Sequence, residues 1–259
     1  MKIAICLSGE PRDFHYIWND LWSKLNCPNA DIYIHTWHSD KKVSELPASK
    51  ERGGEAYQLL LEQTTSADYI YVTKPVSFLI ENYYYSTPYK RFSEYTLSSI
   101  ITRMYSMFYG IQSSLNLVDK QNYDYIVRIR PDMYLEKNLD WDFIQQSLTD
   151  NPMAVLMPDL WLNIGAYPTP WSNETDYWPD FFWIYKSNNN SFRTIYDDIS
   201  KYCGIHIDTQ SNIIGDWPSI PEHYLSRYLK SKDCEAIKMD LKVMIARQHR
   251  QITSGKPIF

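Results

Sequence analysis

The sequence predicts an α/β fold in which a mixed, mostly parallel sheet is flanked by helices. Residues 2–7 have the pattern of a short buried strand, residues 14–25 carry apolar side chains at helical spacing, and residues 31–36 again have a strand pattern. A strand-helix-strand unit favours a parallel sheet with helices on its faces. The length of 259 residues and the 44% hydrophobic content allow a substantial core. Since no repeat or clear linker divides the chain, we expect one domain over residues 1–259.

The remaining elements follow from the same patterns. Apolar spacing predicts a long helix over residues 95–118, directly before the strand pattern that begins at Tyr125. Proline at a first-turn position, followed by a glutamate that complements the helix dipole, predicts a helix from Pro221 to Leu229. Shorter helices are expected over residues 56–63, 141–148 and 191–202. Further strands are expected over residues 69–72, 154–157, 181–185 and 237–246.

Composition excludes several classes of protein. The formal net charge of -5 gives no basic footprint for nucleic acid. The four cysteines lie far apart without a Cys-x-x-Cys pair, so we expect reduced, buried thiols rather than a zinc ribbon. We also expect no transmembrane segment, because no apolar run approaches the roughly 20 residues that cross a bilayer. The first apolar run is too short for a signal peptide and soon meets charged residues, so a cytoplasmic location is expected.

The most informative stretch is residues 123–132, with the sequence Tyr-Asp-Tyr-Ile-Val-Arg-Ile-Arg-Pro-Asp. Its apolar residues predict a buried strand that stops near Pro131, which lacks an amide hydrogen. Asp132 then follows the carboxyl end of the strand, where open α/β sheets bind ligands. Arg128 and Arg130 are suited to bind phosphate or to hold Asp132 in place. A surface ion pair at a strand end is the alternative explanation.

A second cluster follows the first strand, at residues 8–12 (Ser-Gly-Glu-Pro-Arg). Gly9 permits close approach of the backbone to a ligand, and Arg12 is suited to meet a diphosphate or the nucleoside attached to it. The segment matches neither the G-x-G-x-x-G fingerprint nor a Walker loop. A plain turn between a strand and a helix is the alternative.

Three later segments supply possible acid, base or metal-binding groups. Asp180 stands among the aromatic residues of 178–183, where a partly apolar setting would raise its pKa toward a working range for a general base. Glu222 is a second possible base, although a carboxylate there also complements the helix dipole. His249, within residues 247–250 (Arg-Gln-His-Arg), is a possible late metal ligand or part of a solvated tail.

Taken in order, these segments resemble a glycosyltransferase of the GT-A type, as found in large DNA viruses and bacterial surface-polysaccharide clusters. The resemblance rests on short motifs: residues 7–12, residues 31–37 (Asp-Ile-Tyr-Ile-His-Thr-Trp), residues 103–107 (Arg-Met-Tyr-Ser-Met), residues 124–132, residues 180–182 (Asp-Phe-Phe) and residues 221–222 (Pro-Glu). It implies a single GT-A-like domain, with residues 1–135 binding a nucleotide-sugar and residues 136–259 binding an acceptor. For a viral protein, it implies the host cytoplasm.

The resemblance also implies roles for individual residues. GT-A enzymes usually bind a metal and the donor diphosphate through Asp-x-Asp, whereas this chain has Arg130-Pro131-Asp132. Only the last carboxylate is retained, so Arg130 is expected to take part of the charge neutralisation. The expected metal ligands for Mn2+ or Mg2+ are Asp132 and His249. The expected donor-binding residues are Ser8, Gly9, Arg12, Arg103, Arg128, Arg130 and Asp132.

The resulting hypothesis is transfer of a sugar from a nucleoside-diphosphate donor, expected to be a UDP-sugar, to a hydroxyl of a glycan. Asp180 is the first choice for the catalytic base and Glu222 the second, in an inverting reaction. Two alternatives stay open at this point. A nucleotidyltransferase of similar fold would consume a nucleoside triphosphate, and a non-catalytic glycan-binding protein would explain the 22 tyrosines and 9 tryptophans. The sequence leaves the donor sugar, the acceptor, inversion or retention at the anomeric carbon, strict metal dependence, the choice between the two bases and the oligomeric state open.

Overall fold

The structure is a computed structural model of the chain. The structure describes residues 1–11, 14–38, 64–81, 98–161, 179–199, 206–207, 213–214 and 221–245. Within these ranges, the backbone alone is described for residues 98–104, 159–161, 206–207, 213–214, 221–223 and 245.

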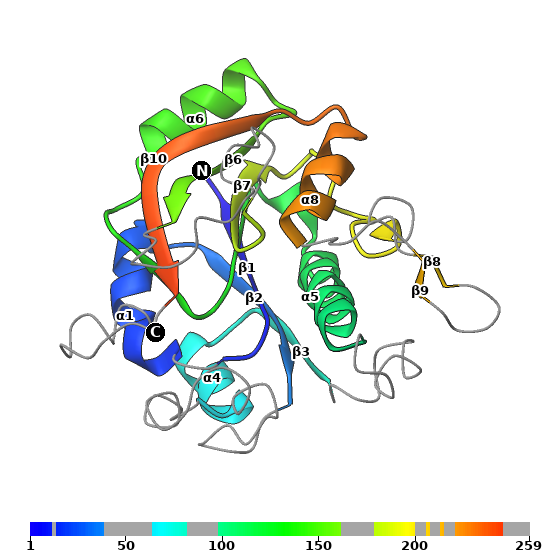
Figure 1. Cartoon of the computed structure of the whole chain (residues 1–259). Helices are drawn as coiled ribbons and strands as arrows, with labels where there is room; N and C mark the ends of the chain where they lie inside the picture. The colour runs from blue at the N-terminus through cyan, green and yellow to red at the C-terminus, as the bar shows by residue number, and fades with distance from the viewer. Residues whose placement is uncertain are drawn as a thin grey trace.

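An eight-stranded sheet forms the centre of the molecule (Figure 1). Its strands in spatial order are β3 (Ser77–Glu81), β2 (Asp31–Trp37), β1 (Ile3–Ser8), β4 (Tyr125–Ile129), β7 (Phe182–Lys186), β6 (Val155–Trp161), β10 (Ala236–Ile245) and β5 (Met133–Leu135). β7 and β5 run against the other strands, so the sheet is mixed and mostly parallel. This arrangement confirms the α/β fold class that the sequence predicts.

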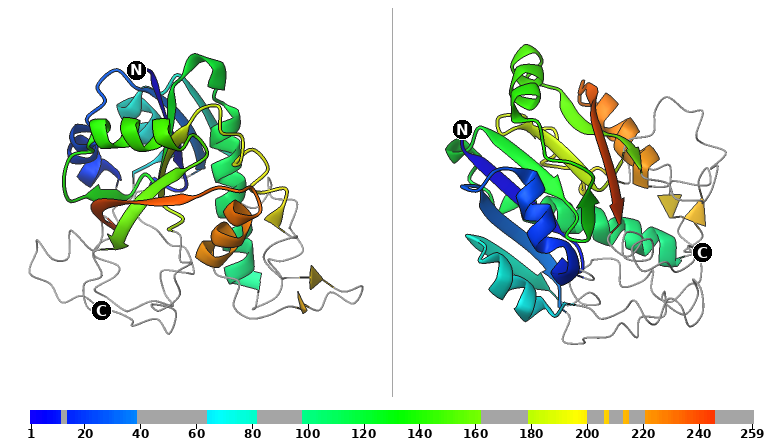
Figure 2. Two further views of the ribbon diagram at one scale, coloured as in Figure 1. Left: turned by 90° about the horizontal axis from the view of Figure 1, so that it is seen from above. Right: turned by 90° about the vertical axis from the view of Figure 1, so that its left-hand side faces the viewer.

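Helices cover both faces of the sheet. Helices α1 (Phe14–Leu25), α4 (Ser66–Thr73) and α6 (Trp141–Asp150) pack on one face, and α5 (Ser98–Asn116) and α8 (Pro221–Lys230) pack on the other. Figure 2 shows the same division from two further directions, with α1 and α4 on one side of β1 and β2 and α5 on the opposite side. The 3-10 helix η2 (Lys120–Asn122) leads into β4, and β8 (His206–Ile207) pairs with β9 (Ile213–Ile214) in a separate two-stranded sheet.

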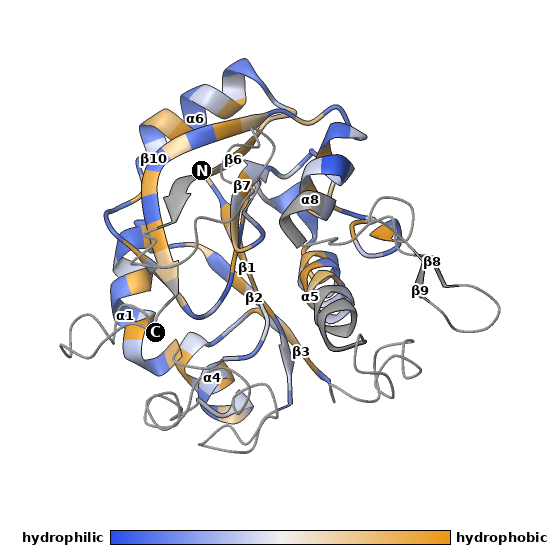
Figure 3. Ribbon diagram, viewed as in Figure 1, coloured by the Kyte–Doolittle hydropathy of each residue, from blue (hydrophilic) through white to orange (hydrophobic). Residues whose placement is uncertain are grey.

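Two hydrophobic layers result from the alternation of side chains along the strands. In β1, Ile3, Ile5 and Leu7 face α1, whereas Ala4 and Cys6 face α5. All six residues of β1 are buried, because helices cover both faces of a parallel sheet. Figure 3 shows the resulting apolar colouring of the central strands. Cys6, Cys27 and Cys234 are free and buried, as expected for the cysteines that the structure describes.

Most predicted elements are confirmed within a few residues at their ends, but two predictions are wrong. Residues 69–72, predicted as a strand, lie in helix α4, which is capped at Thr65 and closed by the left-handed backbone of Lys74. Of the helix predicted over residues 191–202, residues 191–198 form successive turns, residue 199 is helical, and residues 200–202 lie outside the described residues. The helix predicted over residues 56–63 lies outside the described residues. The sequence missed β3 and β5, which are the two edge strands.

Among the helices that the structure describes, none combines the length and the apolar character required to cross a membrane.

Candidate active site

The carboxyl ends of β1, β2, β3 and β4 meet at one edge of the sheet, because these strands are parallel. β7 is antiparallel to β4, so its first residues reach the same edge, where Ile129 pairs with Phe182. The amide of Arg130 extends this pairing by donating to the carbonyl of Phe181 at 3.0 Å. Open α/β sheets bind their ligands at such an edge. Six of the predicted site residues lie there: Ser8, Gly9, Arg128, Arg130, Asp132 and Asp180.

Gly9 forms the turn after β1. Its φ of 121° is a conformation that glycine adopts without strain and other residues rarely adopt. Its amide donates to the carbonyl of His35 at 3.2 Å, and its carbonyl accepts from the Thr36 hydroxyl at 2.9 Å. A Cβ at this position would lie 3.9 Å from Cδ of Pro131, so the turn lies against the Arg130-Pro131-Asp132 segment. Gly9 therefore brings β1 close to that segment, while its own backbone groups are already paired.

Arg128 is fully buried and ties three strands together. Its Nη1 donates to the carbonyl oxygen of Asp180, and its Nη2 donates to the Ser8 hydroxyl at 3.3 Å. The guanidinium carbon lies 5.1 Å from the ring centroid of Trp183, which is within cation-π range. Burial lowers the pKa of Arg128 to about 9, and the negative charge of Asp180 opposes that shift. Arg128 therefore remains a buried cation at neutral pH, and it fixes the positions of Ser8 and Asp180.

Arg130 and Asp132 form a bidentate ion pair in the turn between β4 and β5. Nε of Arg130 donates to Oδ1 of Asp132 at 3.0 Å, and Nη2 donates to Oδ2 at 2.8 Å. The side chain of Asp132 is only 3% exposed, whereas that of Arg130 is 20% exposed. Paired hydrogen bonds of this kind fix the plane of the guanidinium. The pair thus presents its cation, more than its carboxylate, to solvent.

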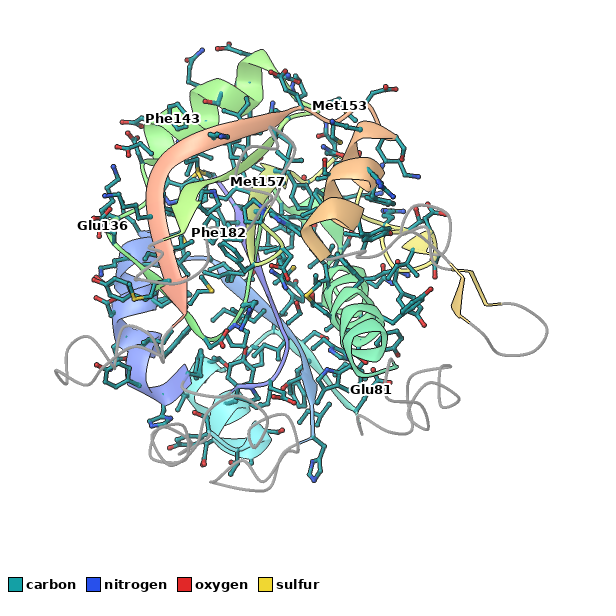
Figure 4. All side chains as sticks on the ribbon, in the orientation of Figure 1. Glu81, Glu136, Phe143, Met153, Met157 and Phe182 are labelled. Carbon is teal, nitrogen blue, oxygen red and sulfur yellow. The ribbon has the colours of Figure 1, made fainter. Side chains whose placement is uncertain are left out.

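Asp180 is 6% exposed and lies immediately before β7. Its carbonyl holds Arg128, and its negative charge favours the protonated form of that guanidinium. Its neighbours Phe181 and Phe182 are fully buried, and Figure 4 shows Phe182 in the middle of the packed side chains. Asp180 is thus a nearly buried carboxylate that directly precedes two buried aromatic residues.

Tyr69 of α4 is a residue that the sequence interpretation missed. Its side chain is fully buried and packs edge-on against Phe14 at 4.5 Å between ring centroids. Among the described residues its hydroxyl has no hydrogen-bond partner. Burial raises its pKa well above the usual value, and the negative charge of Asp132 adds to the shift. Sequence analysis missed this hydroxyl because it predicted residues 69–72 as a strand and not as part of helix α4.

A second missed cluster joins the ends of β2 and β3 to α5. Nε2 of His35 lies 2.8 Å from Oε2 of Glu81, and the Tyr109 hydroxyl donates to Oε1 at 3.1 Å. His35 is fully buried, and burial lowers its pKa, which the hydrogen bond to Glu81 partly offsets. Figure 4 shows Glu81 at the end of β3 beside α5. No sequence spacing links residues 35, 81 and 109, so sequence analysis had no signal for this cluster.

The other predicted site residues are not placed as side chains. Arg12 and His249 lie outside the described residues. Arg103 lies in α5 and Glu222 in the first turn of α8, where only the backbone is described. The roles predicted for these four residues stay predictions.

The described residues alone do not complete a site for Mn2+ or Mg2+. Among them, no group of three or more histidine, cysteine, aspartate or glutamate side chains lies close enough together to hold a metal ion. Asp132 is the expected ligand at this edge, but both of its oxygens already accept hydrogen bonds from Arg130. A divalent ion at Asp132 would have to compete with that guanidinium, so we derive no step through a metal.

Comparison with known proteins does not assign a family. No protein-family model matches the sequence, and no curated protein matches it. One solved structure with similarity is a protein assigned as a glucose-1-phosphate thymidylyltransferase from Bacillus anthracis, in complex with a sucrose. It is 10% identical, the match covers 100% of this chain and 97% of that chain, and the TM-score is 0.42. Similarity at this level carries no argument about function.

Proposed function

We propose that this chain transfers a sugar from a nucleoside-diphosphate donor to a hydroxyl of a glycan. The observation that carries the proposal is the meeting of the Ser8-Gly9 turn, the Arg130-Asp132 pair and Asp180 at the carboxyl edge of parallel strands. Cations beside a glycine turn suit a diphosphate, and a carboxylate among aromatic residues suits a sugar hydroxyl. The resemblance of the motifs to GT-A glycosyltransferases supports the same assignment, with UDP as the expected nucleotide.

In the proposed reaction, the acceptor hydroxyl oxygen attacks the anomeric carbon of the donor sugar. Asp180 takes the hydroxyl proton as this bond forms, with Glu222 as the second choice for the base. The bond from the anomeric carbon to the diphosphate oxygen breaks, and the diphosphate leaves with the electron pair. Arg130 stabilises the negative charge that develops on the leaving group. A single base of this kind gives inversion at the anomeric carbon.

The test is a screen of UDP-, GDP- and CMP-sugars with glycan acceptors, in which release of the nucleotide is measured. Asp180→Asn is expected to lower turnover by roughly 100-fold or more, because loss of a general base typically costs that much. Binding of UDP, measured by calorimetry, should change little in this variant. Asp142→Asn is a matched control, because Asp142 is exposed on α6.

Three results would count against the proposal or a part of it. Full turnover by Asp180→Asn would remove Asp180 from the role of base. Release of pyrophosphate from a nucleoside triphosphate and a sugar phosphate, without transfer to a glycan, would replace the proposal with nucleotidyl transfer. Glycan binding without any affinity for nucleotide would indicate a non-catalytic binding protein.

A further inference from the structure

Arg130 retains free hydrogen-bonding capacity on the side turned away from Asp132. A guanidinium carries five N–H donors, and the bonds to Asp132 use one donor on Nε and one on Nη2. Among the described residues, Nη1 of Arg130 has no partner. The 20% exposure of the Arg130 side chain contrasts with the 3% exposure of the Asp132 side chain. The described residues therefore leave Nη1 unused, and part of the Arg130 side chain reaches solvent.

The surroundings make this edge suitable for an anion. Burial lowers the pKa of the Arg128 guanidinium; the charge of Asp180 opposes this shift, the charge of Arg130 adds to it, and the charge of Asp132 again opposes it. The direct contacts of Arg128 described above are neutral oxygens, the Asp180 carbonyl and the Ser8 hydroxyl. Asp180 and Asp132 balance these two cations, so the unused N–H donors of Arg130, rather than an excess of positive charge, suit this edge for an anion. A phosphate also matches the planar, two-donor geometry of an arginine side chain.

Asp132 has the geometry of a support. Both of its oxygens hold the guanidinium, which fixes the rotamer and the plane of Arg130. Backbone contacts add to this fixation, because the Arg130 amide is bonded to Phe181 and the Gly9 turn lies against Pro131. A cation held in place in this way loses little conformational freedom when a ligand binds.

We propose that Arg130 is the direct cationic contact for a diphosphate group at this edge, that Asp132 positions Arg130 instead of ligating a metal, and that binding of the diphosphate needs no divalent cation. This inference deepens the proposed function and rests on it. It reverses the roles expected from the resemblance, in which Asp132 is the metal ligand and Arg130 assists.

The experiment is calorimetric titration of the full chain with UDP and with inorganic pyrophosphate, each in EDTA and in Mn2+. The wild type is expected to bind with similar affinity in both conditions. Arg130→Gln should weaken binding by on the order of 10- to 100-fold in EDTA, the usual cost of losing charged hydrogen bonds. Arg130→Lys should recover part of this loss, since it restores the charge but not the planar donor edge.

Asp132→Asn and Arg193→Gln complete the design. Asp132→Asn should weaken binding equally in EDTA and in Mn2+, because it disorders Arg130 in both conditions. Arg193→Gln removes an equal charge from an exposed arginine and should leave affinity unchanged. Thermal melting of each variant checks that the fold is retained.

The outcomes separate this inference from the proposed function. Binding by the wild type that requires Mn2+ would overturn the inference while leaving nucleotide-sugar transfer in place. Loss of only the Mn2+-dependent part of binding in Asp132→Asn would also overturn it. Absence of binding to UDP and to pyrophosphate in both conditions would overturn the diphosphate site, and absence of turnover with every nucleotide-sugar of the screen would overturn the proposed function as well.

Discussion

Gly110 shows how a single residue of α5 is constrained by the edge of the sheet beneath it. A Cβ at this position would lie 2.9 Å from Nδ1 of His35, which is closer than carbon atoms normally approach. His35 has little freedom to move away, because it is buried and its other ring nitrogen is held by Glu81. The glycine thus lets α5 pack closely against β2.

We predict that Gly110→Ala destabilises the protein by about 1–2 kcal/mol. Overpacking typically costs about 1–3 kcal/mol, and the better helix propensity of alanine returns up to about 1 kcal/mol. Urea unfolding monitored by tryptophan fluorescence measures the difference. Asn116→Ala, an exposed change at the end of the same helix, should be close to neutral. An increase in the stability of Gly110→Ala would show that His35 moves freely.

The two arginines at this edge of the sheet, Arg128 and Arg130, have different surroundings. Sequence analysis placed Arg128, Arg130 and Asp132 at the end of one strand and Asp180 at the start of another, and the structure brings both to the same edge of the sheet. Sequence analysis left open whether the arginines bind phosphate or support Asp132. The structure separates the two arginines: Arg128 is fully buried behind Ser8, while Arg130 is partly exposed and paired with Asp132. This distinction depends on contacts through space, which the sequence does not encode in any local pattern.

At the scale of elements, α4 shows why a short apolar run is ambiguous. Residues 69–72 (Tyr-Ile-Tyr-Val) have the composition of a strand, and their length does not decide between strand and helix. The caps decide it. The Thr65 hydroxyl accepts from the Asp68 amide at 3.1 Å and donates to the Asp68 carboxylate at 2.8 Å. At the other end, the amide of Lys74 donates to the carbonyl of Ile70 at 3.0 Å.

We predict that Thr65→Ala lowers stability by about 1 kcal/mol, the usual cost of losing an N-cap side chain. The loss should loosen α4 specifically, so that amide hydrogens of residues 69–73 exchange faster with solvent. Hydrogen exchange followed by mass spectrometry tests both the size and the location of the effect. Asn19→Ala, on the exposed surface of α1, serves as the control. Unchanged exchange in α4 would show that tertiary packing, rather than the cap, holds the helix.

At the scale of the whole molecule, the strand order determines how well the backbone amides of each strand are protected from hydrogen exchange with solvent. β1 and β4 lie side by side inside the sheet, with helices on both faces, whereas β3 and β5 are its edges. Local opening requires less free energy where fewer contacts must be broken. Ser8, Arg128 and Asp180 lie in or beside the interior strands β1, β4 and β7, so this part of the site should be rigid.

We therefore predict that amides of β1 and β4 exchange most slowly and those of β3 and β5 much faster. Native-state hydrogen exchange over a time course measures this order directly. Equal protection of β3 would mean that another element or another molecule covers that edge of the sheet. Faster exchange in β1 than in β3 would contradict the strand order itself.

The sequence by itself determined the alternation of strands and helices, the parallel sheet that follows from it, and the position of the charged residues at the ends of strands. These features depend on local periodicity and on residue type, which are readable along the chain. The tertiary structure alone decided that His35 meets Glu81. It alone decided that Arg128 meets Asp180 while Arg130 pairs with Asp132. Several of these contacts join residues far apart in sequence, so they exist only after the sheet has brought its strands together.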